Sequence, residues 1–545
     1  MPTLNWMGKE KVVNHHRDVP FRVLERVPEK SVLDSRGSDC GNMIIHGDNL
    51  EALKSLLPEY EGKVDCIYID PPYNTGNEGW IYNDNVNDPR ITKWLGQVVG
   101  KEGEDFSRHD KWLCMMYPRL QLLRKMMSPT GLIFISIDDN EQSNLKCICD
   151  EIFGAGNFQG SIHWRRRHNQ PNDKTKLLGL VAEHILCYSK SKLALKELMR
   201  NENYGKVEIT GKFSNPDNDP RGDWASKPWK AATNQGGTRY RITAPDGSIF
   251  DETWLGEKST YEALLADGRI YFPKSRSGKL GAPRKKYFKS EREDEGQCAT
   301  NWWPHDIAGC NQNATDELAA IFPETDGKAF DNPKPIELIS RIIGMSTHRD
   351  SIILDAFAGS GTTGAAVLKQ NSTDLGSRKF LLIEIGDYAD SVTAERIRRV
   401  ISGYGEGKSA VAGIDSGFSY YELGPALFDV EEPPIESKSA SPSISLNASV
   451  PAEEVRRYVW HTEARTPYVD RTAECPWLLG EHAQAAYYLA YVPGQETVLD
   501  YDLLKELTMK GHPTVVYASR CALSQEQLDA MGIVFKQIPS QIARM

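Results

Sequence analysis

The feature that most restricts the fold of this chain is an apolar strand that ends at two prolines. Residues Val64–Ile69 predict a buried strand, and the tetrapeptide Asp70-Pro71-Pro72-Tyr73 follows directly. Pro72 has no backbone N–H, so the nearby carbonyl oxygens have one donor fewer within the protein. A carboxylate, carbonyl oxygens and an aromatic ring together favour a planar base with an exocyclic amino group. A simple proline turn after a strand is the alternative, and it leaves the full tetrapeptide unexplained.

A second segment has the pattern strand, glycine turn, helix. Residues 351–353 predict a short strand, Gly359 and Gly361 lie in the turn, and a helical run begins at Ala365. Glycines at a helix N-terminus let the backbone come close to a ligand, although many such turns are only tight connections. The next predicted strand ends at Glu384, near the spacing of roughly 20 residues at which an acid binds ribose hydroxyls. No lysine is placed as in a phosphate-binding loop, which favours a nucleoside over a triphosphate.

Together these motifs resemble a known enzyme family. The tetrapeptide followed by Asn74-Thr75-Gly76, and the loop Phe357-Ala358-Gly359-Ser360-Gly361, are similar to motifs of the amino-group DNA methyltransferases. The tetrapeptide comes long before the glycine loop, and this order resembles the circularly permuted β-class. The segment Gly131–Glu141 resembles the modification subunits of type III restriction systems and their solitary relatives. The resemblance covers residues 40–400 in patches, and the combination is more specific than any single motif.

The resemblance implies both a fold and a function. The fold would be α/β: a Rossmann-like, circularly permuted methyltransferase with a mixed seven-stranded sheet, an inserted target-recognition domain and a small C-terminal α/β domain. The activity would be methyl transfer from S-adenosyl-L-methionine to the N6 amino group of a flipped adenine in double-stranded DNA, in a restriction-modification or phage-defence system. A homodimer and a partner subunit for restriction or another defence activity are also implied.

The resemblance assigns the catalytic role to the tetrapeptide. Asp70 and the backbone carbonyl of Pro71 would accept the two hydrogens of the target amine, which concentrates the nitrogen lone pair on the incoming methyl group. Pro72 completes the turn, and Tyr73 would stack on the extruded base.

The cofactor residues implied by the resemblance lie at the ends of other predicted elements. Lys334 precedes a helix that closes over the methionine end of the cofactor in relatives, and Glu384 would bind the ribose. Asp48 follows a predicted strand and either faces the adenine of the cofactor or caps the helix that begins near Leu50; both interpretations stay open. The expected cofactor contacts are Asp48, Lys334, Asp355, Phe357, Gly359, Gly361, Thr362 and Glu384.

The distribution of charge bears on DNA binding, because the net charge of −10 is unfavourable for it. Residues 157–330 contain 27 Lys+Arg and 23 Asp+Glu, a surplus of +4, so the rest of the chain carries −14. Basic residues cluster at 165–167 and at 274–292. Such clusters often only face solvent, but two within one insertion favour phosphate contacts. The expected DNA contacts are Arg165, Arg166, Arg167, Lys274, Arg276, Lys279, Arg284, Lys285 and Lys286.

Composition argues against several other classes of protein. Ten cysteines without a Cys-x-x-Cys pair argue against a zinc knuckle or a disulfide framework, so we expect no metal, and a cytoplasmic location fits. No apolar run approaches a membrane span, and no signal-peptide core is present. The segment Gly405–Ser409 superficially resembles a phosphate-binding loop, but Ser402 stands where the first glycine is required.

The order of these segments predicts the domain organisation. The loop-rich, basic insertion separates the two halves of the methyltransferase domain, and a Ser/Pro/Glu-rich linker separates that domain from a small unit for subunit or partner contact. The expected ranges are 1–40 (N-terminal arm), 41–194 (catalytic half), 195–330 (target-recognition insertion), 331–425 (cofactor half), 426–452 (linker) and 453–545 (C-terminal α/β domain).

Two other functions stay open at this point. Methylation of the N4 amino group of cytosine uses the same geometry, but that family more often begins the tetrapeptide with serine, so Asp70 favours adenine. A non-catalytic DNA-recognition or scaffold subunit is the alternative of a different class, and the presence of both intact motifs disfavours it.

Overall fold

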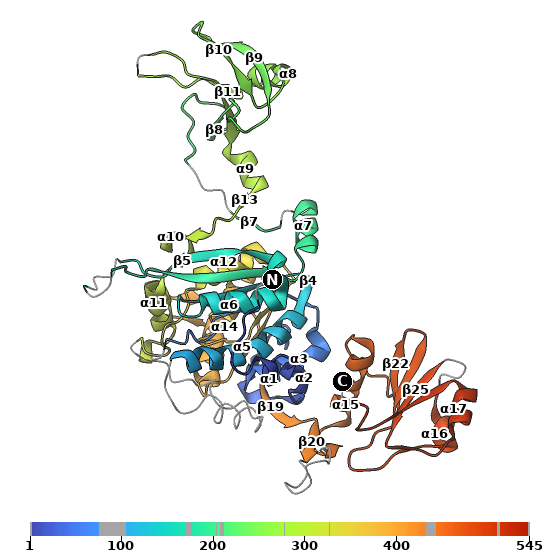
Figure 1. The fold of residues 1–545 in the computed structure, drawn as a ribbon. Coiled ribbons are helices and arrows are strands. Elements are labelled where there is room, and N and C mark those ends of the chain that lie inside the picture. Colours follow the sequence, from blue (N-terminus) through green and yellow to red (C-terminus); the bar gives the residue numbers. More distant parts are fainter. Residues whose placement is uncertain are drawn as a thin grey trace. The chain divides into compact units, whose positions relative to one another are not determined.

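The computed structural model describes residues 3–75, 105–169, 174, 177–202, 204–207, 212–276, 278–325, 327–431, 443–508 and 513–542. These residues fall into two compact units, shown as ribbons in Figure 1. The first unit comprises Met1–Leu198 and Thr300–Met545, and the second comprises Met199–Ala299.

A ten-stranded sheet forms the centre of the first unit. Most of its strands are short apolar segments of the sequence, and they are buried. Its strand order is β1 (Arg22–Arg26), β19 (Ser419–Ala426), β2 (Met43–His46), β16 (Lys379–Glu384), β15 (Ile352–Asp355), β3 (Val64–Ile69), β4 (Met127–Ile137), β6 (Ala182–Ser189), β5 (Phe158–Arg165) and β14 (Trp302–Trp303).

The sheet is mixed, and its directions follow the connections between strands. The six strands from β19 to β4 are parallel, whereas β6 runs antiparallel to β4 and pairs with β5 as a hairpin. The strand count differs from the expected seven. The seven strands from β2 to β5 are present, but β1 and β19 extend the sheet at one edge and β14 at the other.

Helices lie on the connections between parallel strands. The connections through α3 (Asn49–Tyr60) and α5 (Asp105–Met126) advance along the sheet from β2 to β3 and from β3 to β4, while the one through α13 (Thr362–Asp374) returns from β15 to β16. Because such crossovers are right-handed, connections that run in opposite directions place their helices on opposite faces. The direction changes between the neighbours β15 and β3, and ligands of open α/β sheets bind outside the carboxyl ends at such a point. A further helix, α12 (Ile336–Ser346), precedes β15 and packs against α13.

The core lies where the apolar faces of these helices meet the sheet. In α3, Leu50, Leu53, Leu56 and Leu57 form one apolar face, and this face is buried. These leucines belong to a single core cluster that also contains Trp112 of α5 and apolar residues of β3, β4 and β15. The strand ends that carry the polar motifs are therefore held by a packed core.

The N-terminal segment is not an irregular arm, which corrects the expectation for residues 1–40. Trp6, Val12 and Val19 are buried in the same core cluster as α5, and β1 pairs with β19 at the sheet edge. The segment packs against the rest of the first unit through these few apolar side chains, although most of its sequence is polar. Its helices are α1 (Lys9–Val12), α2 (His15–Asp18) and the 3-10 turn η1 (Pro28–Lys30).

Other short elements complete the first unit around the sheet. They are α6 (Gln142–Cys149), the π-helical turns η3 (Asp150–Gly154) and η6 (Ala389–Ala394), the 3-10 turns η4 (Ala155–Asn157), η5 (Pro323–Thr325) and η7 (Gly407–Ser409), α7 (Lys192–Asn201, which continues into the second unit), α10 (His305–Ala308), α11 (Asn311–Ile321), α14 (Glu395–Ser402), β17 (Gly403–Tyr404) and β18 (Val411–Ala412).

The second unit is smaller and rich in short strands, around a core of Trp229, Ile242, Trp254, Tyr261 and Ile270. It is narrower than the insertion expected at 195–330, because β14 pairs with β5 and α11 packs against α14 in the first unit. Its elements are β7 (Lys206–Val207), β8 (Trp224–Pro228), β9 (Thr238–Thr243), β10 (Ile249–Trp254), α8 (Lys258–Ala266), β11 (Ile270–Tyr271), β12 (Arg284–Phe288), α9 (Lys289–Glu295) and β13 (Gln297–Cys298).

The C-terminal part of the first unit contains a separate four-stranded sheet, in the order β22, β23, β25, β27. Part of the expected linker, 432–442, lies outside the described residues. Within the described residues, no helix combines the length and apolarity that crossing a bilayer requires. The elements here are β20 (Phe428–Glu431), β21 (Ser443–Leu446), α15 (Ala452–Ala464), β22 (Leu478–His482), β23 (Ala485–Leu489), β24 (Val498–Leu499), α16 (Tyr501–Glu506), β25 (Thr514–Ala518), β26 (Arg520–Cys521), α17 (Gln525–Met531) and β27 (Ile533–Gln537).

Candidate active site

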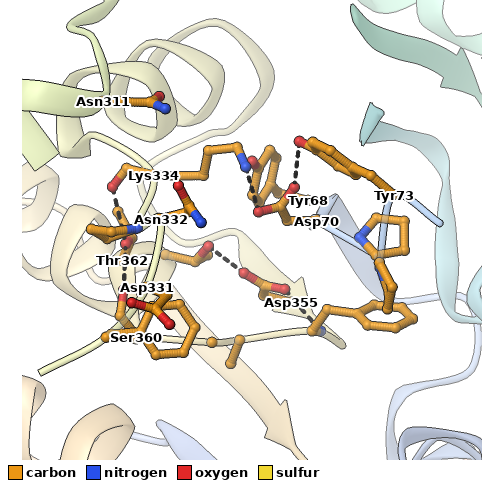
Figure 2. A pocket seen from close by; sticks show the side chains of 18 of the residues that line it. Tyr68, Asp70, Tyr73, Asn311, Asp331, Asn332, Lys334, Asp355, Ser360 and Thr362 are labelled. Carbon is orange, nitrogen blue, oxygen red and sulfur yellow. Dashed lines mark hydrogen bonds and ion pairs between the residues drawn. The ribbon is translucent and has the colours of Figure 1, made fainter. Parts of the chain in front are cut away.

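A cavity of about 500 Å³ opens at the carboxyl ends of β3, β15 and β16, where the connections change direction. This volume lies within the range of ligand pockets. Figure 2 shows that the tetrapeptide and the glycine loop reach the cavity from different sides. The side chains that line it include Tyr68, Asp70, Pro71, Pro72, Tyr73, Arg166, Glu183, Asn311, Phe330, Asn332, Lys334, Asp355, Phe357, Gly359, Ser360, Thr362, Thr363, Glu384 and Tyr388.

Asp70 stands at the end of β3 with a donor on each carboxylate oxygen. The hydroxyl of Tyr73 donates to Oδ1 at 2.9 Å, and the ammonium of Lys334 donates to Oδ2 at 2.5 Å (Figure 2). Thr362 anchors the lysine backbone, because its hydroxyl donates to the Lys334 carbonyl at 3.2 Å. The predicted catalytic acid and the predicted cofactor lysine are thus direct partners.

Glu183 is a second buried carboxylate beside Asp70. Arg166 donates to its Oε1 at 2.8 Å, and the Tyr73 hydroxyl lies 3.1 Å from its Oε2. The Lys334 ammonium lies 3.9 Å from the same Oε2. Arg166, expected to contact DNA, therefore lines the cavity and binds an acid there.

The protonation states of Lys334 and Tyr73 follow from this arrangement. Burial lowers the pKa of Lys334, but the carboxylates of Asp70 and Glu183 outweigh it, so the pKa is raised overall. Burial, reinforced by Asp70, raises the pKa of Tyr73 well above its usual value. Lys334 is consequently a cation and Tyr73 a neutral phenol. The lysine ammonium also lies 5.2 Å from the centre of the Tyr73 ring.

The two proline carbonyls of the tetrapeptide differ in their partners. The indole N–H of Trp112, a fully buried residue of α5, donates to the carbonyl of Pro72 at 2.7 Å. Within the described residues, no hydrogen bond reaches the carbonyl of Pro71, which lines the cavity. The carbonyl of Pro72 is therefore held by the helix, whereas that of Pro71 has no hydrogen-bond partner among the described residues.

A buried polar cluster holds the residue after the tetrapeptide. Asn74 has a left-handed backbone (φ 57°), and its side-chain amide donates to the fully buried Glu141. The same carboxylate binds His109 at 2.5 Å and Asn144 at 2.8 Å. Left-handed backbone is unfavourable for most residues but tolerated by asparagine. Glu141 stabilises the turn that presents Asp70.

The glycine loop approaches an aromatic ring and an acid. Gly359 has φ 51°, and a Cβ there would lie 3.1 Å from the Phe330 ring. Its N–H donates to Glu384 at 2.7 Å. Gly361 lies outside the cavity lining, and its φ of 78° and the Thr393 carbonyl 2.9 Å from an added Cβ explain the glycine. A contact of Gly361 with a cofactor in this cavity is therefore not shown.

Glu384 ends β16 and is almost fully buried. It accepts hydrogen bonds from the N–H groups of Gly359 and Gly386 and from the Tyr388 hydroxyl. Burial raises the pKa of its carboxyl, although these bonds oppose the shift. The acid thus shapes the loop and still borders the cavity, where Phe330 and Tyr388 form an edge-to-face pair.

Asp355 ends β15 and accepts from the N–H of Phe357 at 3.0 Å and the hydroxyl of Thr363 at 2.5 Å. Burial raises the pKa of this carboxyl to about 7, against these two hydrogen bonds and with a further increase from nearby Asp70 and Glu384. A cation bound in the cavity would favour its ionised form.

Arg396 supports the glycine loop from behind. Its fully buried guanidinium donates to Ser360 at 3.1 Å and Thr362 at 2.8 Å, and it pairs with Glu317 at 3.1 Å. Both hydroxyls line the cavity. This arginine orients two lining residues without lining the cavity itself.

Asp48 is a helix cap in this structure. Its Oδ1 accepts from the N–H of Leu50 at 2.7 Å, and its Oδ2 pairs with the buried Arg119 at 2.9 Å. The capping interpretation is confirmed. Asp48 is not among the residues that line the cavity, so a contact with a cofactor there is not shown.

The basic residues expected to bind DNA divide into exposed and internally paired groups. Lys274, Arg276, Lys279 and Arg167 are exposed, whereas Arg165 is half-buried and hydrogen-bonded to nearby carbonyls. Arg284 donates twice to Ser226, and Lys285 is half-buried.

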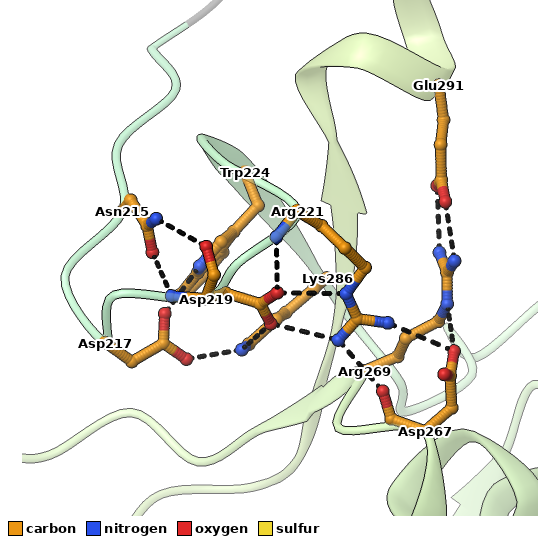
Figure 3. A network of polar contacts seen from close by, with 9 residues as sticks. All are labelled: Asn215, Asp217, Asp219, Arg221, Trp224, Asp267, Arg269, Lys286 and Glu291. Atoms are coloured by element: carbon orange, nitrogen blue, oxygen red, sulfur yellow. Dashed lines mark hydrogen bonds and ion pairs between the residues drawn. The ribbon is translucent and has the colours of Figure 1, made fainter.

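Lys286 was expected to contact DNA, and the structure contradicts this. Its side chain is buried between Asp217 and Asp219, with its ammonium 4.9 Å from the centre of the Trp224 ring (Figure 3). The strand β12 alternates its side chains between two faces, so one lysine of the run points inward. Lys286 stabilises the second unit.

Several cavity residues were not singled out from the sequence. Glu183 is the second residue of the apolar strand β6, and an acid at the start of such a run could have indicated a strand end near the site. Phe330, Asn332 and Tyr388 come from loops without a motif. In the part of the chain that the structure describes, no group of three or more His, Cys, Asp or Glu is placed to hold a metal ion.

The cavity fits S-adenosylmethionine by the chemistry of its lining. Glu384 and Asp355 suit hydroxyl and ammonium donors, and Phe330 and Phe357 offer apolar surface for a nucleoside. The bare Cα of Gly359 leaves the room that a side chain would fill against Phe330. Asp70 and Pro71 line the same cavity.

The chain is similar in sequence to known restriction-modification subunits and to a type II methyltransferase. The chain is 35% identical over 450 residues to the type III restriction-modification enzyme StyLTI Mod subunit of Salmonella typhimurium, covering 77% of this chain and 66% of that protein. It is 30% identical to the EcoPI Mod subunit of Escherichia phage P1 over 70% of this chain and 63% of that protein. It is 32% identical to the type II methyltransferase M.KpnI of Klebsiella pneumoniae over 66% of this chain and 84% of that protein.

These matches identify the family of the chain, although they do not extend over the whole of each relative. The chain spans about two thirds of the length of the two Mod subunits. A family model described as DNA methylase matches residues 64–395, which include both strands that carry the motifs and the whole second unit. The chain therefore belongs to the N6/N4 DNA methylase family.

Proposed function

We propose that this protein transfers a methyl group from S-adenosylmethionine to the N6 amino group of a flipped adenine in double-stranded DNA. One observation carries the proposal: Asp70 and the glycine loop end neighbouring parallel strands and line the same cavity. Ile353 and Leu354 of β15 lie in register with Cys66 and Ile67 of β3. The strand pairing thus brings an acceptor for an amine beside a nucleoside site.

The chemistry assigned to the tetrapeptide is that of two acceptors for one amine. The exocyclic amine is a weak nucleophile because its lone pair is delocalised into the ring. Asp70 and the Pro71 carbonyl accept its two hydrogens and draw the nitrogen towards tetrahedral geometry, which directs the lone pair to the reacting carbon. Orientation and preorganised hydrogen bonds supply most of the rate enhancement.

S-adenosylmethionine, when bound, supplies a methyl group on a positively charged sulfur. Glu384 is assigned to the ribose, and Phe357 and Gly359 to the wall beside the nucleoside. Asp355 and Thr362 are assigned to the amino-acid end. The acidic and carbonyl-rich lining favours a cation there.

DNA recognition is assigned to the second unit and to the exposed basic residues. Lys274, Arg276 and Lys279 would contact phosphates, together with Arg167. An adenine flipped out of the duplex would stack on the Tyr73 ring, a contact worth about 1–3 kcal/mol for a base on an aromatic side chain.

Adenine is preferred over cytosine because the tetrapeptide begins with Asp70. The family description itself covers both N6 and N4 methylation. Incubating the purified protein with labelled cofactor and mixed DNA, followed by digestion to nucleosides, tests this choice. Label in N6-methyladenine supports the proposal. Label in N4-methylcytosine selects the other substrate, and DNA binding without label selects a non-catalytic subunit.

The assembly is a further part of the proposal. The names of the Salmonella and phage P1 relatives identify them as Mod subunits of restriction-modification enzymes. We assign the C-terminal part, 453–545, to contacts with a second copy of the chain or a restriction subunit. Light scattering of the full chain tests the homodimer, and a monomer at all concentrations would contradict it.

A further inference from the structure

Both carboxylate oxygens of Asp70 have a donor before any substrate arrives. Tyr73 occupies Oδ1 and Lys334 occupies Oδ2. Each oxygen has a second lone pair, so a target amine that binds Asp70 must either share an oxygen with one of these donors or displace it. The Lys334 ammonium is the costlier group to displace, because a cation in a largely enclosed site is destabilised without an anionic partner.

Glu183 offers that partner without moving. Arg166 holds its Oε1 at 2.8 Å, which leaves Oε2 turned towards Tyr73 at 3.1 Å and Lys334 at 3.9 Å. The Tyr73 hydroxyl has one hydrogen, so it can serve Asp70 or Glu183 but not both fully. Both donors of Asp70 thus lie near the same second acceptor.

The other acids of the cavity are less suited to receive the lysine. Asp355 is bound by Phe357 and Thr363, and Glu384 by backbone N–H groups and Tyr388. Within the described part of the chain, the carboxylates within 4.0 Å of the Lys334 ammonium are those of Asp70 and Glu183.

We propose that Glu183 is a positioning residue that receives the Lys334 ammonium when the target amine takes its place on Asp70. This inference rests on the proposed function. Asp70 and Glu183 carry two negative charges, and Lys334 and Arg166 carry two positive charges. Moving the ammonium from one carboxylate to the other keeps all four charges paired, so a neutral amine can enter without expelling a cation into solvent.

The Lys334 side chain can move its ammonium over the short distance from Asp70 to Glu183. Its backbone is fixed by the Thr362 hydroxyl, while its four-carbon stem is flexible and its ammonium carries three hydrogens. In the free site it occupies the acceptor that the substrate needs and keeps the Asp70 carboxylate oriented. Lys334 then competes with the amine, and Glu183 weakens that competition.

The test measures how readily the target base leaves the duplex. Once sequencing has mapped the modified adenine, 2-aminopurine in place of the neighbouring base leaves the target amine intact and reports the extrusion of the adenine by its fluorescence. Lys334→Met removes the competitor, so we expect the extrahelical population to rise above that of the wild type. Glu183→Gln leaves the ammonium without a second anionic partner, so we expect the population to fall, with single-turnover methyl transfer slower by about tenfold.

The double variant gives the sharpest result. If Glu183 acts through Lys334, adding Glu183→Gln to Lys334→Met changes the fluorescence by less than about twofold, because the ion that it receives is gone. A merely structural role of Glu183 would lower the fluorescence equally in both backgrounds. Cofactor affinity of Glu183→Gln, measured by calorimetry, is expected to stay within about twofold of the wild type.

A matched control lies elsewhere in the same unit. Glu151 accepts from a lysine and a tyrosine, Lys9 at 2.6 Å and Tyr117 at 2.9 Å, but does not line the cavity. Glu151→Gln is expected to leave base flipping and methyl transfer unchanged. It therefore controls for loss of a half-buried lysine–carboxylate–tyrosine contact.

The outcomes separate this inference from the function on which it rests. Wild-type protein that transfers no label to any DNA overturns both. Transfer by the wild type, with fluorescence lowered in both single variants, overturns the exchange alone. Should Glu183→Gln lose cofactor binding through misfolding, Lys334→Met decides: fluorescence at or below the wild-type level overturns the exchange, and a rise supports it.

Discussion

Two networks of charged side chains in this molecule are built from the same groups and differ in what surrounds them. In the second unit, Lys286, Arg221 and Arg269 bind acids that lie on nearby turns and on α9 (Figure 3). Arg221 and Arg269 also lie over the Phe288 ring. These contacts join segments within the second unit to one another.

The network of the first unit instead borders a cavity. Asp70, Glu183 and Lys334 come from segments far apart in the chain, and two donors share acceptors that a ligand also needs. In the second unit, the Arg221 hydrogen bond lowers the pKa of Asp219 and so favours its ionised, paired state. The comparison teaches that a dense set of ion pairs indicates function only where a ligand can take the place of one of the donors.

The largest effect is expected for Asp70→Ala. Removing the carboxylate takes away one of two acceptors of the amine, so the methyl-transfer rate should fall by about 10²–10³ or more. Calorimetry should show that the cofactor still binds, since Asp355 and Glu384 remain. A rate that stays at the wild-type level would show that the cavity network is structural, like that of the second unit.

Lys286→Met should destabilise the second unit without changing the methyl-transfer step. The change leaves Asp219 with Arg221 as its remaining cation and takes from Asp217 its lysine partner, so the free energy of unfolding should fall. Thermal unfolding measures it, with the exposed Lys279→Met as the control. Unchanged stability together with weaker DNA binding would restore Lys286 as a phosphate contact.

Asp355→Asn should change how stability depends on pH. Burial raises the pKa of Asp355 to about 7, so the folded state binds a proton that the unfolded state releases at lower pH. Its contribution is present at low pH and is lost as the pH rises through about 7. Unfolding midpoints between about pH 5 and pH 8 should therefore fall more steeply for the wild type than for the variant. Parallel curves would contradict this.

The smallest effects are expected for single exposed bases. Lys274→Ala or Arg276→Ala should weaken binding to all DNA sequences alike and lower the slope of log affinity against log salt by about 1 each. Filter binding across salt concentrations measures the slope, and unfolding should be unchanged. A slope equal to that of the wild type would place DNA contacts elsewhere.

Local patterns predicted much of the first unit. The strands Val64–Ile69 and Lys379–Glu384 were expected from their apolar runs, because a strand that is buried on both faces is apolar along most of its length. The domain assignments of residues 1–40 and of Trp302–Trp303 were wrong. Their packing depends on a few apolar residues that do not recur at a regular spacing.

The sequence by itself determined the two motifs, the strand-turn-helix context of each, and the family to which they belong. Only the tertiary structure decided that Asp70 meets Lys334 and Glu183, that Lys286 points inward and that Asp48 is a cap. The physical reason is that hydrogen bonds and ion pairs depend on distances of a few ångström between segments hundreds of residues apart. Strand pairing and side-chain direction set those distances, and local composition does not.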